Sequence, residues 1–132
     1  MDMALCVFDP STNMLEYAGA NCPLYLVRDG EVMQFAPNKM PVGGFAVEAE
    51  AFTGHEIPLR KGDAVYIFSD GYADQFGGLK GKKFLYRRFR ELLIAIDPEP
   101  PEKRKALLNE TFSAWKGTQE QVDDILVMGM RA

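Results

Sequence analysis

The sequence has few residues that bind transition metals. Its 132 residues include two cysteines, Cys6 and Cys22, and one histidine, His55. The cysteines do not form a C-x-x-C pair, and a single histidine cannot complete a Cys/His zinc set, so a zinc site of that kind is excluded. Both cysteines are expected to be free thiols in a reducing cytoplasm.

Long apolar runs are also missing. No run approaches the ~20 residues that a membrane-spanning helix needs, and the N-terminus lacks the basic-then-apolar pattern of a signal peptide. Hydrophobic residues make up 47% of the sequence and charged residues 26%, which is typical of a soluble globular protein. We therefore expect a cytoplasmic polypeptide without membrane contact, although a longer parent protein could be membrane-anchored through an N-terminal region.

Positive charge is in the minority, with 15 basic and 19 acidic residues and a net charge of −4. A mildly acidic chain binds polyanions poorly, so no nucleic-acid partner is expected. The dense basic stretch runs from Lys80 to Arg90. Its helical pattern predicts a solvated helix face, and the alternative is a docking surface for an acidic partner or a phosphoprotein.

Apolar runs separated by turn-forming residues fill the first half of the sequence, which is typical of strands. Asp29-Gly30 stands between two such runs, and both residues tolerate the positive φ that a tight hairpin needs. Residues 64–68 are apolar throughout, which indicates a strand buried on both faces. The predicted strands are 5–8 and 14–18 as a first hairpin, a second hairpin over 23–35, then 51–59 and 64–68, with irregular backbone over 38–45.

After these strands, apolar residues recur at the spacing of an amphipathic helix. One helix is predicted over residues 83–96, because Asp97-Pro98 ends it; its apolar positions are Leu85, Phe89, Leu92, Leu93 and Ile96. A second helix begins near Pro101 and ends at Lys116-Gly117; its apolar stripe is Leu108, Phe112 and Trp115. Residues 125–130 form a last strand. Strands followed by helices predict an α+β fold with mostly antiparallel sheets.

Two acidic positions lie beside predicted strands. Asp70 comes just after strand 64–68, and Asp123-Asp124 comes just before the last strand. If these strands pair antiparallel, Asp70 and Asp123 converge, and converging carboxylates repel unless a cation or a proton lies between them. Oxygen-only ligation favours Mg²⁺ or Mn²⁺. The sequence shows no third ligand, so an ordinary turn and an ordinary strand edge stay open as the alternative.

Three other motifs do not support a site. Residues 77–82 are glycine-rich, but a P-loop needs glycine at Phe76 and serine or threonine at Lys83, so a flexible loop is expected. His55 has no nucleophile in a recognisable elbow and is expected to be a half-exposed strand residue. Cys6 lies in an apolar run, where thiols are usually inert.

Four segments resemble the signature of SpoIIE-like serine phosphatases. Residues 59–74 match a leucine, a Gly-Asp turn, an apolar strand and Ser/Thr-Asp-Gly followed by an acidic residue. Residues 121–125 resemble the closing Gln-x-Asp-Asp-Ile element, residues 18–21 the Ala-Gly-His/Asn segment, and residues 40–43 a Pro-φ-Gly segment. The four segments occur in the family's order and span most of the chain.

The resemblance implies the C-terminal portion of a metal-dependent type-2C (PPM) protein phosphatase domain in bacterial signalling. It implies two stacked, largely antiparallel sheets flanked by helices, and hydrolysis of phosphoserine or phosphothreonine at a two-metal centre holding Mn²⁺ or Mg²⁺. Asp70 and Asp123 match metal-binding aspartates, while Gly71 and Asp124 take supporting places and Asp74 matches an acidic position without an assigned role. The implied substrate is a regulatory phosphoprotein, such as a phosphorylated anti-sigma-factor antagonist, and the implied parent protein is a sensor-phosphatase.

The sequence departs from the family in one respect. An Asp-x-x-Gly-His-Gly-like segment, which the N-terminal half of the domain contributes, does not occur, and Thr53-Gly54-His55 echoes it in the wrong place. We therefore expect residues 1–132 to be a single partial domain that is inactive alone and dimerises through exposed sheet edges. The alternatives are a non-catalytic interaction module on a phosphatase-like fold and a small sensory sandwich that binds a ligand between its sheets.

Overall fold

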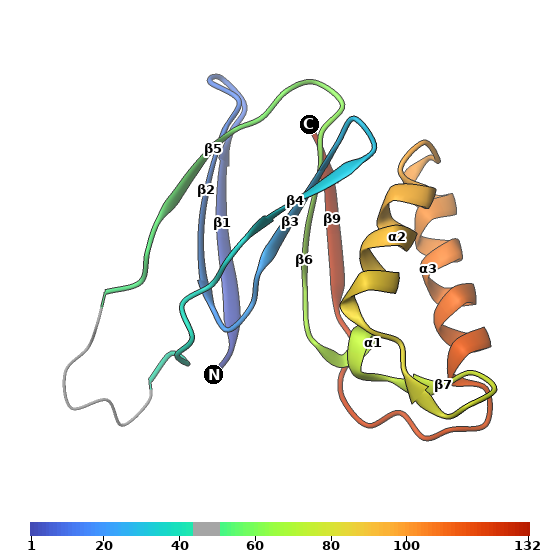
Figure 1. The fold of residues 1–132 in the computed structure, drawn as a ribbon. Coiled ribbons are helices and arrows are strands. Elements are labelled where there is room, and N and C mark those ends of the chain that lie inside the picture. Colours follow the sequence, from blue (N-terminus) through green and yellow to red (C-terminus); the bar gives the residue numbers. More distant parts are fainter. Residues whose placement is uncertain (44–50) are drawn as a thin grey trace. The chain divides into compact units, whose positions relative to one another are not determined.

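A computed structural model describes residues 1–43 and 51–132 of the chain (Figure 1). These residues divide into two units. The first contains Met1–Arg28, the described part of Met33–Phe68, and Val127–Ala132; the second contains Asp29–Val32 and Ser69–Leu126. Strands come first along the chain, helices follow, and a strand closes it, in the predicted order.

The first sheet has three antiparallel strands in the order β1-β2-β5: β1 (Met3–Asp9), β2 (Met14–Ala20) and β5 (His55–Pro58). The Asp9 carboxylate shapes the turn after β1, since it accepts hydrogen bonds from the backbone N–H and the hydroxyl of Ser11 at 2.9 and 2.6 Å. Asn13 follows with φ 54°, a value that asparagine tolerates. The predicted first hairpin is therefore confirmed.

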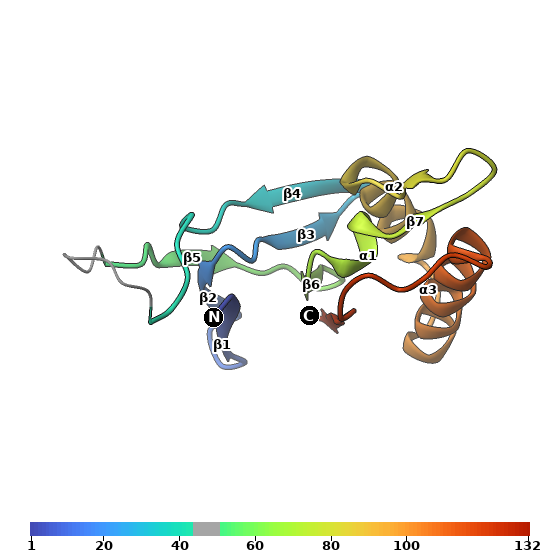
Figure 2. The same cartoon turned by 90° about the horizontal axis from the view of Figure 1, so that it is seen from below.

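The second sheet has four strands in the order β4-β3-β6-β9: β3 (Leu24–Arg28), β4 (Glu31–Phe35), β6 (Ala64–Phe68) and β9 (Val127–Arg131). Asp29 and Gly30 turn between β3 and β4 with φ of 51° and 74°, as predicted, and both views show these two strands side by side (Figures 1 and 2). β6 and β9 pair antiparallel, with Phe68 opposite Val127. This pairing is the one that the convergence of Asp70 and Asp123 requires.

Apolar side chains from both sheets share one core. The inner positions of β2 and β5, the residue after β5, and the buried strands β3 and β6 contribute Leu15, Tyr17, Leu24, Leu26, Ile57, Leu59 and Val65. Each of them is at most 6% exposed, and burial of one such side chain contributes about 1.5–3 kcal/mol. The two-sheet, largely antiparallel α+β fold is therefore confirmed.

A buried ion pair fixes the turn that leads into β6. Arg28 donates to Asp63 through Nε at 2.9 Å and Nη2 at 2.6 Å, and Asp63 also accepts the backbone N–H of Arg60 at 2.7 Å. The hydrogen bond from the Arg28 guanidinium is the largest effect on the pKa of the Asp63 carboxyl, and it lowers that pKa. Burial raises the pKa, and the hydrogen bond from the Arg60 N–H lowers it further. The pKa of Asp63 is therefore below its usual value. Asp63 is 2% exposed, so this pair is shielded from solvent.

The second unit contains α1 (Gly71–Asp74), a hairpin of β7 (Phe76–Gly77) and β8 (Lys82–Lys83), α2 (Tyr86–Ile96) and α3 (Pro101–Lys116). The ring of Tyr72 on α1 is its aromatic centre, with the rings of Phe84, Phe89 and Phe112 at 5.3, 5.1 and 5.2 Å. The Tyr72 hydroxyl donates to the carbonyl of Leu108 at 2.8 Å. α1 is thereby held against α2 and α3.

Several predicted boundaries need correction. The helix predicted over 83–96 begins only at Tyr86, because Lys83 belongs to β8 and Leu85 has φ 78°. The glycine-rich stretch predicted as a flexible loop is the turn of the β7–β8 hairpin. The strand predicted over 51–59 covers only β5, and the last strand starts at Val127 rather than at residue 125. Residues 44 and 45 of the predicted irregular segment lie outside the described residues.

The apolar stripe of α3 is also less enclosed than predicted. Leu108, Phe112 and Trp115 are half-buried, and Arg104 is the buried residue of the helix. By contrast α2 buries Phe89, Leu93 and Ile96, as its spacing predicts. Within residues 1–43 and 51–132, no helix is long and apolar enough to cross a membrane.

Candidate metal centre

Asp70 is placed by the end of β6 and the start of α1. It occupies the N-cap position of α1 with φ −75° and ψ −11°, and its backbone carbonyl accepts the N–H of Asp74 at 3.0 Å. Its side chain makes no capping hydrogen bond. An aspartate at this position usually caps the helix, so here the carboxylate is left to interact with other groups.

Ser69 connects the end of β6 to the segment that carries Asp123. Its backbone N–H donates to the carbonyl of Leu126 at 3.0 Å, and its hydroxyl accepts the N–H of Leu126 at 3.0 Å. The same hydroxyl donates to the carbonyl of Asp124 at 2.9 Å. These bonds extend the pairing of β6 and β9 beyond the sheet, and they set the two acidic segments side by side.

Gly71 permits this close approach. A Cβ atom at this position would collide with the carbonyl oxygen of Asp124, and it would lie 3.0 Å from the carbonyl carbon of Asp124 and 3.1 Å from Cγ1 of Ile125. Two of these three atoms belong to the backbone and cannot move aside by a rotamer change. The absence of a side chain at Gly71 therefore allows the two segments to approach, and its supporting role in the site stays a prediction.

The carboxyl groups of Asp70 and Asp123 meet. The pKa of Asp70 is raised above its ordinary value, first by burial, then by a side-chain hydrogen bond with Asp123, and then by the negative charges of Asp123 and Asp74. A hydrogen bond between two carboxyl groups requires that one of them carries a proton, and a cation between them would remove that need. The predicted convergence is confirmed, and the role of both residues as metal ligands stays a prediction.

The backbone orients Asp123. Its own Oδ1 accepts the N–H of Asp124 at 2.7 Å, and its carbonyl accepts Nε2 of Gln121 at 3.0 Å. Asp124 contributes its backbone carbonyl, which receives the Ser69 hydroxyl. The hydrogen bond to Asp124 in this structure is made by its main chain, and its supporting role in the site stays a prediction.

The donor set fits a hard divalent cation in kind, because it consists of carboxylate oxygens. It is incomplete in number, since the part of the chain that the structure describes contains no group of three or more His, Cys, Asp or Glu side chains able to hold a metal ion. Asp74 does not complete it, because its carboxylate faces Lys83 Nζ at 3.6 Å.

Sequence reasoning missed Gln75, which is fully buried. Its Nε2 donates to the carbonyls of Glu120 at 2.8 Å and Phe76 at 3.0 Å, and the backbone carbonyl of Gln75 accepts Nε1 of Trp115 at 2.9 Å. The side chain thereby fixes the segment that leads to Asp123. No pattern in the sequence distinguishes this glutamine from an exposed one.

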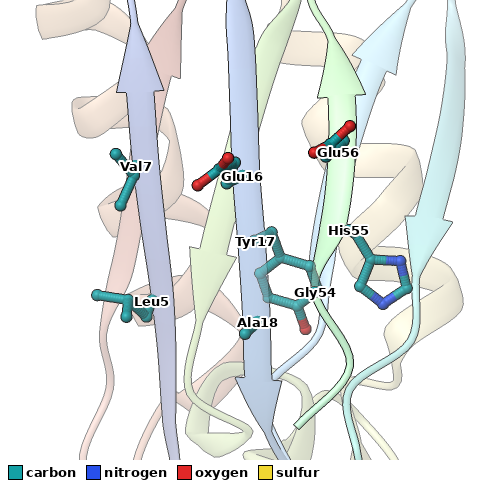
Figure 3. A pocket seen from close by; sticks show the side chains of 8 residues that line it. All are labelled: Leu5, Val7, Glu16, Tyr17, Ala18, Gly54, His55 and Glu56. Carbon is teal, nitrogen blue, oxygen red and sulfur yellow. The ribbon is translucent and has the colours of Figure 1, made fainter.

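A recess of about 350 Å³ lies elsewhere, on the sheet of β1, β2 and β5 (Figure 3). Leu5, Val7, Glu16 and Glu56 line it, beside Tyr17 and His55. Leu5 and Val7 are 57% and 55% exposed, so the recess is open to solvent. It is therefore not the enclosed pocket that a sensory sandwich would need.

Comparison with known proteins gives the following findings. The family model described as stage II sporulation protein E (SpoIIE) matches residues 1–132. The SiaA-PP2C domain of Pseudomonas aeruginosa is 30% identical with a TM-score of 0.89, covering 99% of this chain and 51% of that chain. The chain thus spans about half the length of that structure. No curated protein matches.

Two further solved structures share the fold. The phosphatase domain of SpoIIE from Bacillus subtilis is 15% identical with a TM-score of 0.72, covering 98% of this chain and 57% of that chain. The RsbU and RsbW domains of Rv1364c from Mycobacterium tuberculosis are 22% identical with a TM-score of 0.73, covering 98% and 35%.

Proposed function

This chain belongs to the SpoIIE family, and we propose that it forms the C-terminal part of a metal-dependent protein serine/threonine phosphatase domain. The observation that supports this most directly is the meeting of Asp70 and Asp123 beside Gly71. Solved relatives are PP2C-type phosphatase domains, and domains of this type depend on Mn²⁺ or Mg²⁺.

Asp70 and Asp123 would hold the divalent ions. When bound, such ions supply an activated water and neutralise charge on a phosphoryl group. The chain's own contribution is placement: Ser69 sets the separation of the two acidic segments, Gly71 lets them touch, and α1 fixes Asp70 through Tyr72. Both aspartates are exposed, so a phosphorylated segment of another protein can reach them.

The isolated chain should not turn over substrate. Two carboxylates hold Mg²⁺ or Mn²⁺ weakly, because tight sites recruit further ligands. The remaining ligands would come from residues outside this chain, as expected for a partial domain. The proposed substrate is a regulatory phosphoprotein of the anti-sigma-factor-antagonist kind, and the substrate is inferred from family resemblance alone.

A titration with Mn²⁺ followed by NMR tests the site without requiring turnover. Paramagnetic broadening should concentrate on the amides of Gly71 and Asp124, and it should disappear in Asp70→Asn and Asp123→Asn. Glu110→Gln on the exposed side of α3 is the matched control, because it removes one negative charge from the same unit. Broadening that survives both aspartate variants would refute the proposal.

One observation favours a second function. Because the described residues lack a third ligand, the fold could serve as a non-catalytic interaction module in which the acidic pair has no chemical role. That alternative predicts no site-specific broadening by Mn²⁺, and it predicts no gain of phosphatase activity when the chain is joined to a segment that carries the missing acidic ligands.

A further inference from the structure

The basic segment after α1 carries charge that the proposed metal site does not use. Residues 76–90 contain six basic residues and no acidic residue, in a chain whose net charge is −4. On α2, Arg87 pairs with Glu91 at 3.7 Å, and the Arg88 guanidinium lies 4.4 Å from the ring centroid of Trp115. Arg90 also lies on α2, and the remaining three basic residues, Lys80, Lys82 and Lys83, belong to the β7–β8 hairpin.

The hairpin has a fixed base. The N–H of Gly78 donates to the carbonyl of Trp115 at 2.8 Å, and a Cβ atom on Gly78 would lie only 2.8 Å from the Trp115 ring. On the returning strand, Phe84 N–H donates to the carbonyl of Gln75 at 2.9 Å. Contacts of this kind at both strands hold the tip in one place, which lowers the entropy lost when a partner binds there.

The hairpin is open to solvent. Leu79 is 109% exposed and Phe76 is 40% exposed. Lys80 and Lys82 are exposed as well, and no ion pair is formed by either among residues 1–43 and 51–132. Two apolar side chains among unpaired cations form a surface that suits an acidic partner with an apolar residue.

The base of the same hairpin contacts α1. Lys83 Nζ lies 3.6 Å from the carboxylate of Asp74 and 5.8 Å from the ring centroid of Phe76. Asp74 belongs to the single turn of α1 that begins after Asp70, and its N–H donates to the carbonyl of Asp70 at 3.0 Å. The base of the hairpin is thus joined to α1, the helix that Asp70 precedes.

We propose that the β7–β8 hairpin is a docking surface for an acidic segment of the phosphoprotein substrate, with Lys80 and Lys82 opposite its carboxylates and Leu79 against an apolar side chain. This proposal rests on the proposed function. The acidic site itself would repel a phosphorylated, acidic segment, and the exposed lysines of the hairpin would attract such a segment. Lys83, which Asp74 already holds, marks the end of the surface nearest the site.

Binding measured by fluorescence anisotropy tests the proposal without metal or turnover. The ligand is a labelled peptide with one phosphoserine flanked by glutamates, compared with a peptide in which lysines replace the glutamates. The test variant is Lys80→Glu/Lys82→Glu. The matched control is Lys61→Glu/Lys105→Glu, which makes the same change of net charge at exposed positions outside the hairpin.

The hairpin variant should weaken binding of the glutamate-flanked peptide by about tenfold, because two surface ion pairs each change affinity by roughly threefold. The control should bind as the wild type does, and the lysine-flanked peptide should bind weakly to the wild type and the control. Equal affinities in the hairpin and control variants, or a wild type that does not bind the peptide, would overturn the proposal. Neither result bears on Mn²⁺ binding, so the phosphatase proposal stands or fails separately.

Discussion

Replacing Gly71 with alanine tests whether the acidic site depends on a close backbone contact. The new Cβ atom would collide with the carbonyl oxygen of Asp124 and lie 3.0 Å from its carbonyl carbon. Gly71 does not have a positive φ, so the cost is steric rather than conformational. Overpacking of this kind costs about 1–3 kcal/mol.

The magnitude can be measured by thermal unfolding. For a domain of this size 1 kcal/mol corresponds to roughly 3–4 °C in Tm, so Gly71→Ala should melt about 3–12 °C below the wild type. The change should also move Asp123 away from Asp70 and weaken Mn²⁺ binding. Helix propensity works in the opposite direction, since alanine is favoured over glycine by up to ~1 kcal/mol in a helix.

Gly54→Ala is the matched control. Gly54 is also without a positive φ, and a Cβ atom there would meet nothing within 4 Å. The same chemical change should therefore be neutral or stabilising by about 0.4–1 kcal/mol. If Gly71→Ala and Gly54→Ala melt at the same temperature, the contact between Gly71 and Asp124 does not constrain the site, and the reasoning is wrong.

Four further predictions concern stability and association. Ser69→Ala should lose about 0.5–1.5 kcal/mol by urea unfolding, because it removes the hydrogen bonds of its hydroxyl to two solvent-exposed partners, whereas Ser113→Ala on the exposed side of α3 should change little. Leu85→Gly should gain about 1 kcal/mol in the same assay, because glycine adopts φ 78° without strain; a loss would show that the exposed leucine side chain matters more. The pKa of Asp63 is lowered in the folded state, so the stability that its carboxylate contributes is complete above the unfolded pKa and is lost as pH falls through the folded pKa. Asp63→Asn should therefore make the free energy of unfolding fall less steeply below about pH 4. An unchanged pH dependence of stability below about pH 4 would contradict this. The edge strand β1 has charge only at its end, so light scattering should detect dimers that grow with concentration, and a monomer at high concentration would count against open edges.

Local sequence rules predicted the parts of the fold that short-range chemistry decides. Asp29-Gly30 forms its turn because both residues accept positive φ, and β6 was found because every residue in it is apolar. The pairing of β6 with β9 then brings Asp70 to Asp123, although the two lie far apart in sequence. The convergence was therefore predictable from topology.

Tertiary contacts determine the start of α2 and the β7–β8 hairpin, which local sequence patterns did not predict. Leu85 has helical spacing with Phe89, yet Phe84 is the buried residue, because its ring packs on Tyr72 at 5.3 Å and its N–H binds Gln75. That arrangement delays the start of α2 and creates the β7–β8 hairpin. Short strands of two residues leave no periodic signal, and the buried role of Gln75 depends on Trp115, 40 positions away.

The most direct measurement is anomalous diffraction from crystals of this chain soaked in Mn²⁺. If the two aspartates form half of a cation site, a peak should lie within ~2.0–2.2 Å of carboxylate oxygens from both Asp70 and Asp123. Saturating Mn²⁺ that leaves this position without a peak, while the carboxyl groups stay hydrogen-bonded to each other, would contradict the assignment.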